Sequence, residues 1–204
     1  MPPSLNLVIR DAGHGDHAAI VHVLAAAFAD GAVARWIESD PTTRYLQSIG
    51  YFDDAVAEAL ASGVIRLAVE GDETVAAALW IPHPPVKAEP SGPEQETEAM
   101  RRLRLLGELL AERHPDDRPH HCLTFLGVRP DRQNRGIGSY LLDGHHALLD
   151  ATVTPAYLEA NDPRNHELYL RHGYTDVGAP VTAPGSSAPV WPMWRQPTPR
   201  GGAR

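Results

Sequence analysis

Apolar and polar positions follow two patterns along the chain, one typical of strands and one typical of helices. Short apolar or alternating runs end at glycine, proline or aspartate, as strands do. Between them, apolar residues recur at spacings of three and four, the period of a helix with one buried face. Strands are expected at 5–10, 64–70, 75–81, 122–128, 156–160, 174–181 and 189–195, and helices at 16–28, 33–39, 43–62, 94–114, 139–149 and 165–172.

The stretch 122–140, CLTFLGVRPDRQNRGIGSY, joins a buried strand to a glycine-rich loop and a helix. Gly136 and Gly138 let the backbone approach a ligand, and the first N–H groups of the following helix favour an anion. Arg132 and Arg135 add positive charge. The loop lacks the third small residue of a dinucleotide fingerprint and the lysine of a Walker A loop. The pattern predicts a phosphate or pyrophosphate site, with a plain glycine-rich turn as the alternative.

Composition narrows the classes of function. The 204 residues are 43% hydrophobic and 22% charged, which predicts one domain over 1–196, with a flexible tail at 197–204. A net charge of −8 argues against a nucleic-acid surface and suits a cationic substrate. No apolar run reaches the roughly 18 residues of a membrane span, and no signal peptide is visible. The single cysteine, Cys122, fits a cytoplasmic location and is expected to pack in the core rather than act as a nucleophile.

The 11 histidines raise the question of a metal site. None falls in a His-Glu-x-x-His motif. The adjacent pairs His120-His121 and His145-His146 have side chains that point in different directions on a strand or a helix. We therefore expect surface and cleft histidines and no metal ion.

Two motifs resemble those of the GNAT superfamily of N-acetyltransferases. Gln133-Asn134-Arg135-Gly136-Ile137-Gly138, after Val128-Arg129-Pro130, resembles its coenzyme A signature, and Tyr169-Leu170-Arg171-His172-Gly173-Tyr174 resembles its Tyr-x-x-x-Gly-Phe/Tyr element. The order of the expected elements also matches. The resemblance implies an α/β fold: a single GNAT-type domain whose central sheet is mixed, mostly antiparallel, splayed at the coenzyme site and flanked by helices. It also implies acetyl-CoA as a co-substrate.

Within the superfamily, the chain most resembles the puromycin N-acetyltransferase-like enzymes of actinobacteria. The residues that carry this likeness are 24–30, the alanine-rich strand that reaches Trp80, His114-Pro115, 126–133 and 158–165. The resemblance implies transfer of acetyl to the amine of a small molecule, such as an antibiotic or another natural product, in resistance or tailoring. A protein amine as the acceptor remains open, as does a binding module that senses acyl-CoA without chemistry. A monomer or a homodimer is expected.

The resemblance also implies which residues hold the coenzyme. Main-chain groups of Leu126 and Val128 would pair with the pantetheine, where Gly127 permits a bulge or is a plain packing glycine. Asn165 would contact the coenzyme or cap its own helix, and Asn161 and Asp162 compete for that contact. The pyrophosphate would be bound by amides of Gln133, Asn134, Arg135, Gly136, Ile137, Gly138 and Ser139.

Tyr169 is the expected general acid that protonates the leaving thiolate, because a phenol of ordinary pKa about 10 can donate to a thiolate. Its alternative is a packing role. Glu159 is the preferred general base, through water, ahead of His121 and Glu70. The substrate wall is assigned to Phe28, Trp36, Trp80 and His121, with core packing equally open for the three apolar aromatic residues.

Overall fold

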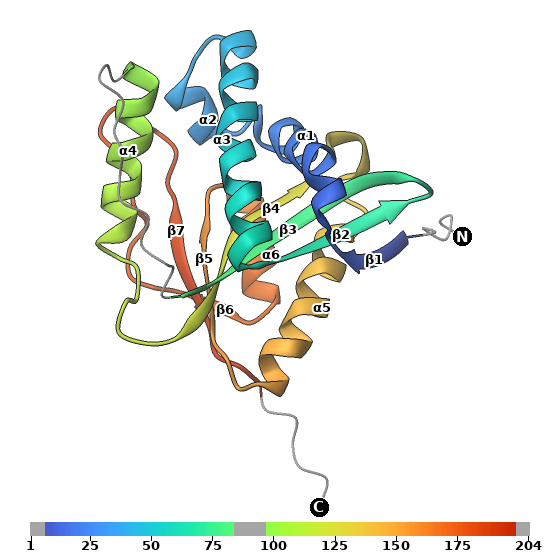
Figure 1. Cartoon of the computed structure of the whole chain (residues 1–204). Helices are drawn as coiled ribbons and strands as arrows, with labels where there is room; N and C mark the ends of the chain where they lie inside the picture. Colours follow the sequence, from blue (N-terminus) through green and yellow to red (C-terminus); the bar gives the residue numbers. More distant parts are fainter. Residues whose placement is uncertain (1–6, 84–96, 199–204) are drawn as a thin grey trace, which may run out of the picture.

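The computed structural model describes residues 7–83 and 97–198, which form a seven-stranded sheet with helices on both faces (Figure 1). The strand order is β1-β2-β3-β4-β5-β7-β6. All neighbouring strands are antiparallel except β4 and β5, so the predicted mixed, mostly antiparallel sheet is confirmed. The strands are β1 (Leu7–Asp11), β2 (Val64–Glu70), β3 (Glu73–His83), β4 (His120–Val128), β5 (Ala156–Ala160), β6 (Tyr174–Asp176) and β7 (Trp191–Arg195).

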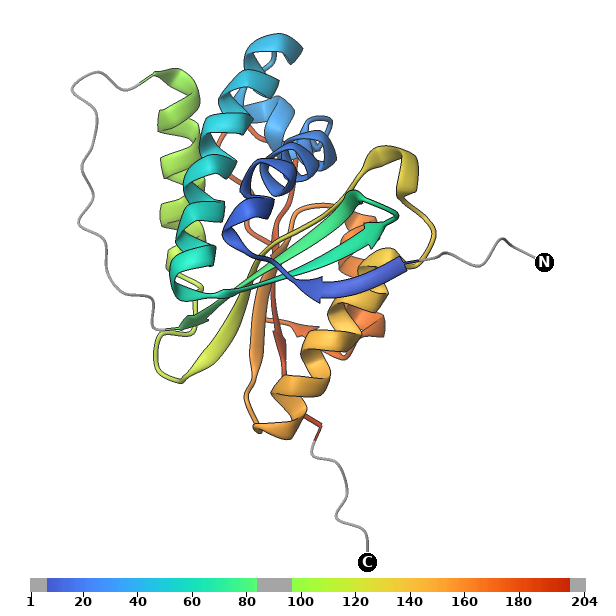
Figure 2. The ribbon, with the colours of Figure 1, turned by 45° about the vertical axis from the view of Figure 1, so that its right-hand side comes forward.

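The helices cover the two faces of the sheet in separate groups, as Figure 2 shows. Apolar side chains of α1 and α3 form one core layer with the sheet, and those of α5 and α6 form another on the opposite face. Trp80 lies in the layer under α5, and its neighbour Leu79 lies under α1 and α3. The helices are α1 (His17–Phe28), α2 (Ala32–Ile37), α3 (Pro41–Ser62), α4 (Glu98–Ala111), α5 (Ile137–Ala151) and α6 (Pro163–Arg171).

Strands β4 and β5 pair only over the first part of β4. Their parallel register joins His121, Cys122 and Leu123 to 156–158 and then stops. From Thr124 onward β4 stays paired with β3, while β5 continues along β7 through Ala160. The two central strands therefore separate, which confirms the predicted splay.

The irregularity in β4 lies at Thr124 and not at Gly127. Leu79 pairs with Phe125 and Trp80 with Leu123, so Thr124 is the extra residue of a bulge. A Cβ on Gly127 would lie 2.8 Å from Leu24 Cδ2 and 3.2 Å from the Ala27 Cβ. Of the two alternatives for Gly127, the packing glycine is the observed one: it does not form the bulge and lets α1 pack closely on β4.

Several expected elements differ from the observed ones at their ends. Helix α4 stops at Ala111, before the expected 114, and β6 is shorter than the expected strand because Val181 forms only an isolated bridge to Val190. The expected proline-rich loop falls mostly at 84–96, outside the described residues, as does 199–204 of the expected tail. The tail begins close to the core, since the Thr198 N–H donates to the Asp150 carboxylate at 2.8 Å. Of the helices in 7–83 and 97–198, none has the length and hydropathy needed to cross a membrane.

Candidate active site

A cavity of about 920 Å³ opens where β4 and β5 separate, with α3 and α4 on one side and α6 on the other. Five of the residues proposed from the sequence line it together: Phe28, Leu126, Glu159, Asn165 and Tyr169. These residues come from α1, β4, β5 and α6. The fold thus gathers side chains that are up to 141 positions apart in the chain (169 − 28) around one space.

Main-chain groups of β4 face this gap at the positions expected to pair with a pantetheine. The Arg129 N–H donates to the Val75 carbonyl at 2.9 Å, which makes these two residues a hydrogen-bonded pair of the β3–β4 ladder. Such pairs alternate in an antiparallel ladder. The N–H and C=O groups of Gly127 therefore point to β3. Those of Leu126 and Val128 point away from β3, toward the gap. The Gln133 side chain donates to the Val128 carbonyl at 3.0 Å and so fixes the following loop to this edge.

The loop after β4 has the backbone shape of an anion site. Asn134 and Gly136 have positive φ values of 62° and 79°. Gly136 is the N-cap of α5 and has no side chain that could accept a hydrogen bond. The first N–H groups of α5 are therefore not capped by a side chain at this position and can donate to an anion. Gly138 lies over Leu126, since its Cβ would be 3.7 Å from the Leu126 Cδ2. The helix start and the open edge of β4 are thus adjacent.

The arginines of this loop do not all contribute free charge. The Arg132 guanidinium is paired with Glu70 at 2.7 Å and with Asp131 at 2.6 Å, so the expected contribution of Arg132 is largely neutralised. Arg135 is exposed and makes no ion pair with another described residue. A cation that the sequence analysis did not assign is Arg164 of α6, which donates to the Asn134 side chain at 2.9 Å.

The start of α6 settles which polar residue caps it. Asp162 is the N-cap, and its carboxylate accepts the Arg164 N–H at 2.8 Å. Asn165 is therefore not the cap. Asn161 and Asn165 both line the cavity, and both are placed to contact a ligand there.

Tyr169 and Glu159 both line the cavity, one as a proton donor and the other as a proton acceptor. Burial raises the pKa of the Tyr169 phenol, so it keeps its proton at neutral pH. Burial also raises the pKa of Glu159, although the Tyr157 hydroxyl donates to this carboxylate at 3.1 Å. A carboxylate with a raised pKa is a stronger base. Burial raises the pKa of Cys122 to about 12, so this thiol stays protonated and is a poor nucleophile.

A cluster of aromatic rings forms the apolar wall of the cavity. Phe125 packs edge-on against Phe28, Tyr51 and Phe52, with ring centroids 5.1 to 5.8 Å away. The sequence analysis proposed only Phe28 from this set. Phe52 and the apolar residues of α4 lie in segments whose apolar residues recur with a helical period. That period alone does not distinguish a cavity wall from a core.

Three residues assigned to the substrate wall do not line this cavity. Trp80 is fully buried and stacks on His145 with ring centroids 4.1 Å apart. His121 lies on the same side of the sheet, with its Nδ1 3.2 Å from the His145 Nε2. Trp36 borders a separate hollow with Arg102, whose guanidinium lies 5.9 Å from the indole centroid. We remove all three from the candidate site.

The histidines also differ from the expectation of surface and cleft positions. His120, His145 and His146 are at most 5% exposed. His145 and His146 lie side by side in sequence on α5, yet both rings meet Trp80. The prediction is wrong for these three residues. Other elements cover the faces of β4 and α5 that carry them, and the local sequence does not show this.

Comparisons with known proteins indicate the family to which this fold is similar. Residues 101–176, which span α4 to β6, match the sequence model of the acetyltransferase (GNAT) domain. A Corynebacterium glutamicum structure described as histone acetyltransferase HPA2 and related acetyltransferase aligns over 96% of this chain and 98% of its own, with 24% identity and a TM-score of 0.68. The fold is that of a GNAT acetyltransferase.

Other solved structures share the GNAT fold at lower identity. A protein from the mosquito Aedes aegypti named as an arylalkylamine N-acetyltransferase 7 aligns over 94% of this chain and 88% of its own, with 14% identity and a TM-score of 0.73. The PaiA N-acetyltransferase of Thermoplasma acidophilum, solved in complex with coenzyme A, aligns over 94% and 99%, with 11% identity and a TM-score of 0.59. These likenesses concern the fold.

Proposed function

We propose that this chain transfers an acetyl group from acetyl-CoA to the amine of a small molecule with an apolar or aromatic body. The observation that carries the proposal is one cavity that joins the open edge of β4, a protonated phenol and a half-buried carboxylate: Leu126, Tyr169 and Glu159. A cytoplasmic location, where acetyl-CoA is available, is part of the proposal.

The coenzyme would be held by main-chain groups along β4 and at the start of α5. Its pantetheine would add to the β4 edge at Leu126 and Val128, in the manner of a strand. Its pyrophosphate would accept hydrogen bonds from the main-chain N–H groups of 137–139, and Arg135 and Arg164 would supply positive charge. Asn161 and Asn165 are both candidates for a further side-chain contact with the coenzyme.

The reaction moves three protons and exchanges two bonds. The protonated acceptor amine first loses a proton to Glu159, directly or through a water, and Glu159 passes it to solvent. The neutral nitrogen then bonds to the acetyl carbon as the carbon–sulfur bond breaks, the thiolate takes the proton of Tyr169, and the surplus proton on the nitrogen returns to the Tyr169 oxygen. A main-chain N–H of Leu126 or Val128 stabilises the carbonyl oxygen as it gains charge. The raised pKa of Glu159 favours its role as base.

The acceptor class is inferred from the cavity wall. The rings of Phe28, Tyr51, Phe52 and Phe125 suit an apolar or aromatic group, and the net charge of −8 suits an amine that arrives protonated. The resemblance to the puromycin N-acetyltransferase-like enzymes supports an antibiotic or another natural product, and hence a role in resistance or tailoring.

The test is release of free thiol from acetyl-CoA with a panel of amines: arylalkylamines, aminonucleosides, aminoglycosides, polyamines and peptides. We expect turnover with at least one apolar small amine, an acetylated product by mass spectrometry, and strong loss of rate in Glu159→Gln. Acetyl found only on protein lysines would replace the small acceptor with a protein. Tight coenzyme binding without turnover across the panel would favour the acyl-CoA sensor.

A further inference from the structure

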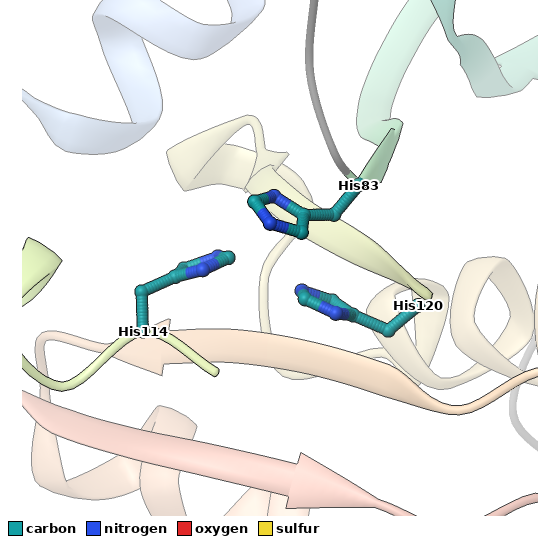
Figure 3. A group of neighbouring side chains, drawn as sticks. All are labelled: His83, His114 and His120. Carbon is teal, nitrogen blue, oxygen red and sulfur yellow. The ribbon is translucent and has the colours of Figure 1, made fainter. Parts of the chain in front are cut away.

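Three histidine rings from separate segments point toward one another beside the proposed acceptor cavity (Figure 3). His83 ends β3, His114 follows α4 and His120 begins β4. Their ring centroids are 4.5 to 5.0 Å apart, and one nitrogen from each ring lies within 4.8 Å of the other two. Two of the three, His83 and His114, line the cavity itself.

His120 has one ring nitrogen, Nε2, whose lone pair accepts no hydrogen bond from a described residue. Its Nδ1 lies 2.9 Å from the Arg118 carbonyl, which can only accept, so Nδ1 carries the proton. The Nε2 is then an acceptor, and it is buried with no hydrogen-bond partner among the described residues. Buried polar atoms are rarely left without a partner. Histidines that bind metals show the same arrangement, in which one nitrogen donates to a carbonyl and the other binds the ion.

A carboxylate stands beside the other two rings. The Asp116 Oδ1 lies 3.1 Å from the His114 Nδ1 and 3.3 Å from the His83 Nε2. Ligands of a tetrahedral zinc ion, about 2.0 to 2.1 Å from the metal, are separated by roughly 3.3 Å. These two separations therefore match edges of such a tetrahedron. Asp116 is otherwise exposed, with 74% of its side chain accessible, so it can adjust to an ion.

We propose that His83, His114 and His120 bind a divalent transition-metal ion such as Zn²⁺, with the Asp116 carboxylate beside it. Three imidazoles and a carboxylate are a ligand set that this ion takes up. His83 and His120 are nearly parallel, at 18°, so one ring turns about its side-chain torsions to bring both nitrogens to the ion. The ion lies on the wall of the acceptor cavity, on the side of β3 and β4.

A second cluster in the described part of the chain is a weaker candidate. Asp143, His146 and His172 also bring ligand atoms within 4.8 Å. Their nitrogens are already engaged: His146 Nε2 lies 3.0 Å from the Tyr174 hydroxyl, and His172 contacts Ser139 and Asp143 at 3.1 Å each. Binding there would displace existing hydrogen bonds of every histidine in the cluster. In the first cluster the His114 Nδ1 also has a partner, Asp116, but the His120 Nε2 has none that an ion would displace.

The experiment uses the full chain without an affinity tag, stripped of metals with a chelator and then dialysed. Zn²⁺ is titrated by calorimetry, and Co²⁺ by its visible absorption, which is strong when the ion is tetrahedral. We expect one ion per chain, a tetrahedral Co²⁺ spectrum and a Zn²⁺-dependent rise in melting temperature. His114→Ala and His120→Ala should each weaken Zn²⁺ binding at least about 100-fold, and Asp116→Asn about 10-fold.

Two variants keep the result interpretable. His22→Ala removes an exposed histidine far from the cluster in sequence and should bind Zn²⁺ as wild type does. His114→Ala lies in a loop after α4, so it tests the site even if His120→Ala, in the buried start of β4, fails to fold. Zn²⁺ affinity unchanged in a folded His114→Ala protein overturns the proposal. Loss of binding in His172→Ala alone moves the site to the second cluster and overturns it equally.

Discussion

At the scale of single residues, Tyr169 is the proposed general acid, and it is a buried phenol that keeps its proton. Its side chain is 7% exposed, and its ring packs against Tyr174 with centroids 5.8 Å apart. No hydrogen bond of its hydroxyl is found within the described ranges, so the proton is not committed to another protein group. A thiolate that leaves into the same apolar surroundings is itself more basic than in water, which helps it take this proton.

Tyr169→Phe removes the hydroxyl and keeps the ring. Since a general acid contributes roughly 10²- to 10⁴-fold, kcat should fall within that range while the dissociation constant for acetyl-CoA stays nearly constant. Steady-state kinetics and calorimetry measure the two quantities. A variant that turns over within about threefold of wild type would assign the proton to water and leave Tyr169 a packing residue.

Gly138 offers a test of the coenzyme loop that spares the fold. A Cβ at this position would make only ordinary contacts of 3.7 Å with Leu126 and Leu168, so Gly138→Ala should fold normally and bind coenzyme A at near wild-type affinity. Gly138→Asp adds a negative charge at the helix start, where it opposes the pyrophosphate. We expect coenzyme affinity to drop at least about 10-fold by calorimetry in Gly138→Asp. Equal affinities in the two variants would place the pyrophosphate elsewhere.

At the scale of elements, the cavity depends on where β4 leaves β5. Pairing ends at Leu123 and Leu158, and the bulge at Thr124 follows at once. The loop and α5 then begin at a fixed distance beyond the open edge. A substitution that shifts the register of β3 against β4 should therefore displace both the β4 edge proposed to bind the coenzyme and the aromatic wall proposed to bind the acceptor.

Gly63, between α3 and β2, lies directly against the backbone of β3. A Cβ there would lie 2.3 Å from the Trp80 carbonyl oxygen, which belongs to backbone in a central strand. Gly63→Ala should lower the free energy of unfolding by about 1 to 3 kcal/mol, the usual cost of overpacking. The matched control is Gly50→Ala, in the exposed interior of α3 with nothing within 4 Å, which should gain up to about 1 kcal/mol. Urea titrations measure both, and a Gly63→Ala protein as stable as wild type would show that β2 and β3 can shift freely.

The elements and the site were predictable to different degrees. Periodicity located the strands and helices because one buried face leaves a regular trace in sequence, and the two motifs placed Tyr169 and the loop. The same periodicity could not tell which buried face meets a cavity. Trp80 was assigned to the wall with core packing equally open, and it packs on α5. Phe125 belongs to a strand expected to be buried, and it lines the cavity. His83, His114 and His120 are brought together by three different segments, and no local pattern records that.

At the scale of the whole molecule, the buried histidines couple stability to pH. Burial lowers the pKa of His120 to about 4 and those of His145 and His146 to about 3, well under the ordinary value near 6.5. Arg195 and His172, both near His146, lower its pKa further, while Asp150 opposes them. All three rings are neutral in the folded chain at pH 5 and largely protonated in the unfolded chain.

The sign of the effect follows from these protons. Between pH 6.5 and about 4 these three rings bind up to three protons more in the unfolded state than in the folded state. The stability that they contribute is therefore fully present above pH 6.5 and is lost as pH falls through this window. Each proton is worth about 1.4 kcal/mol per pH unit. Glu159 acts in the opposite direction, because its raised pKa lets the folded state hold a proton there, and it offsets part of the loss.

We therefore expect the free energy of unfolding, measured by urea titration with chelator present, to fall by a few kcal/mol from pH 7.5 to pH 5. His146→Gln should reduce the slope by about one proton's share, while His22→Gln, exposed on α1, should keep the wild-type slope. The chelator matters because an ion on His120 would hold that ring neutral and move its share of the transition to lower pH. Equal stability at pH 7.5 and pH 5 would mean that the folded chain admits protons to these rings, and hence that their surroundings open to water far more readily than the packing indicates.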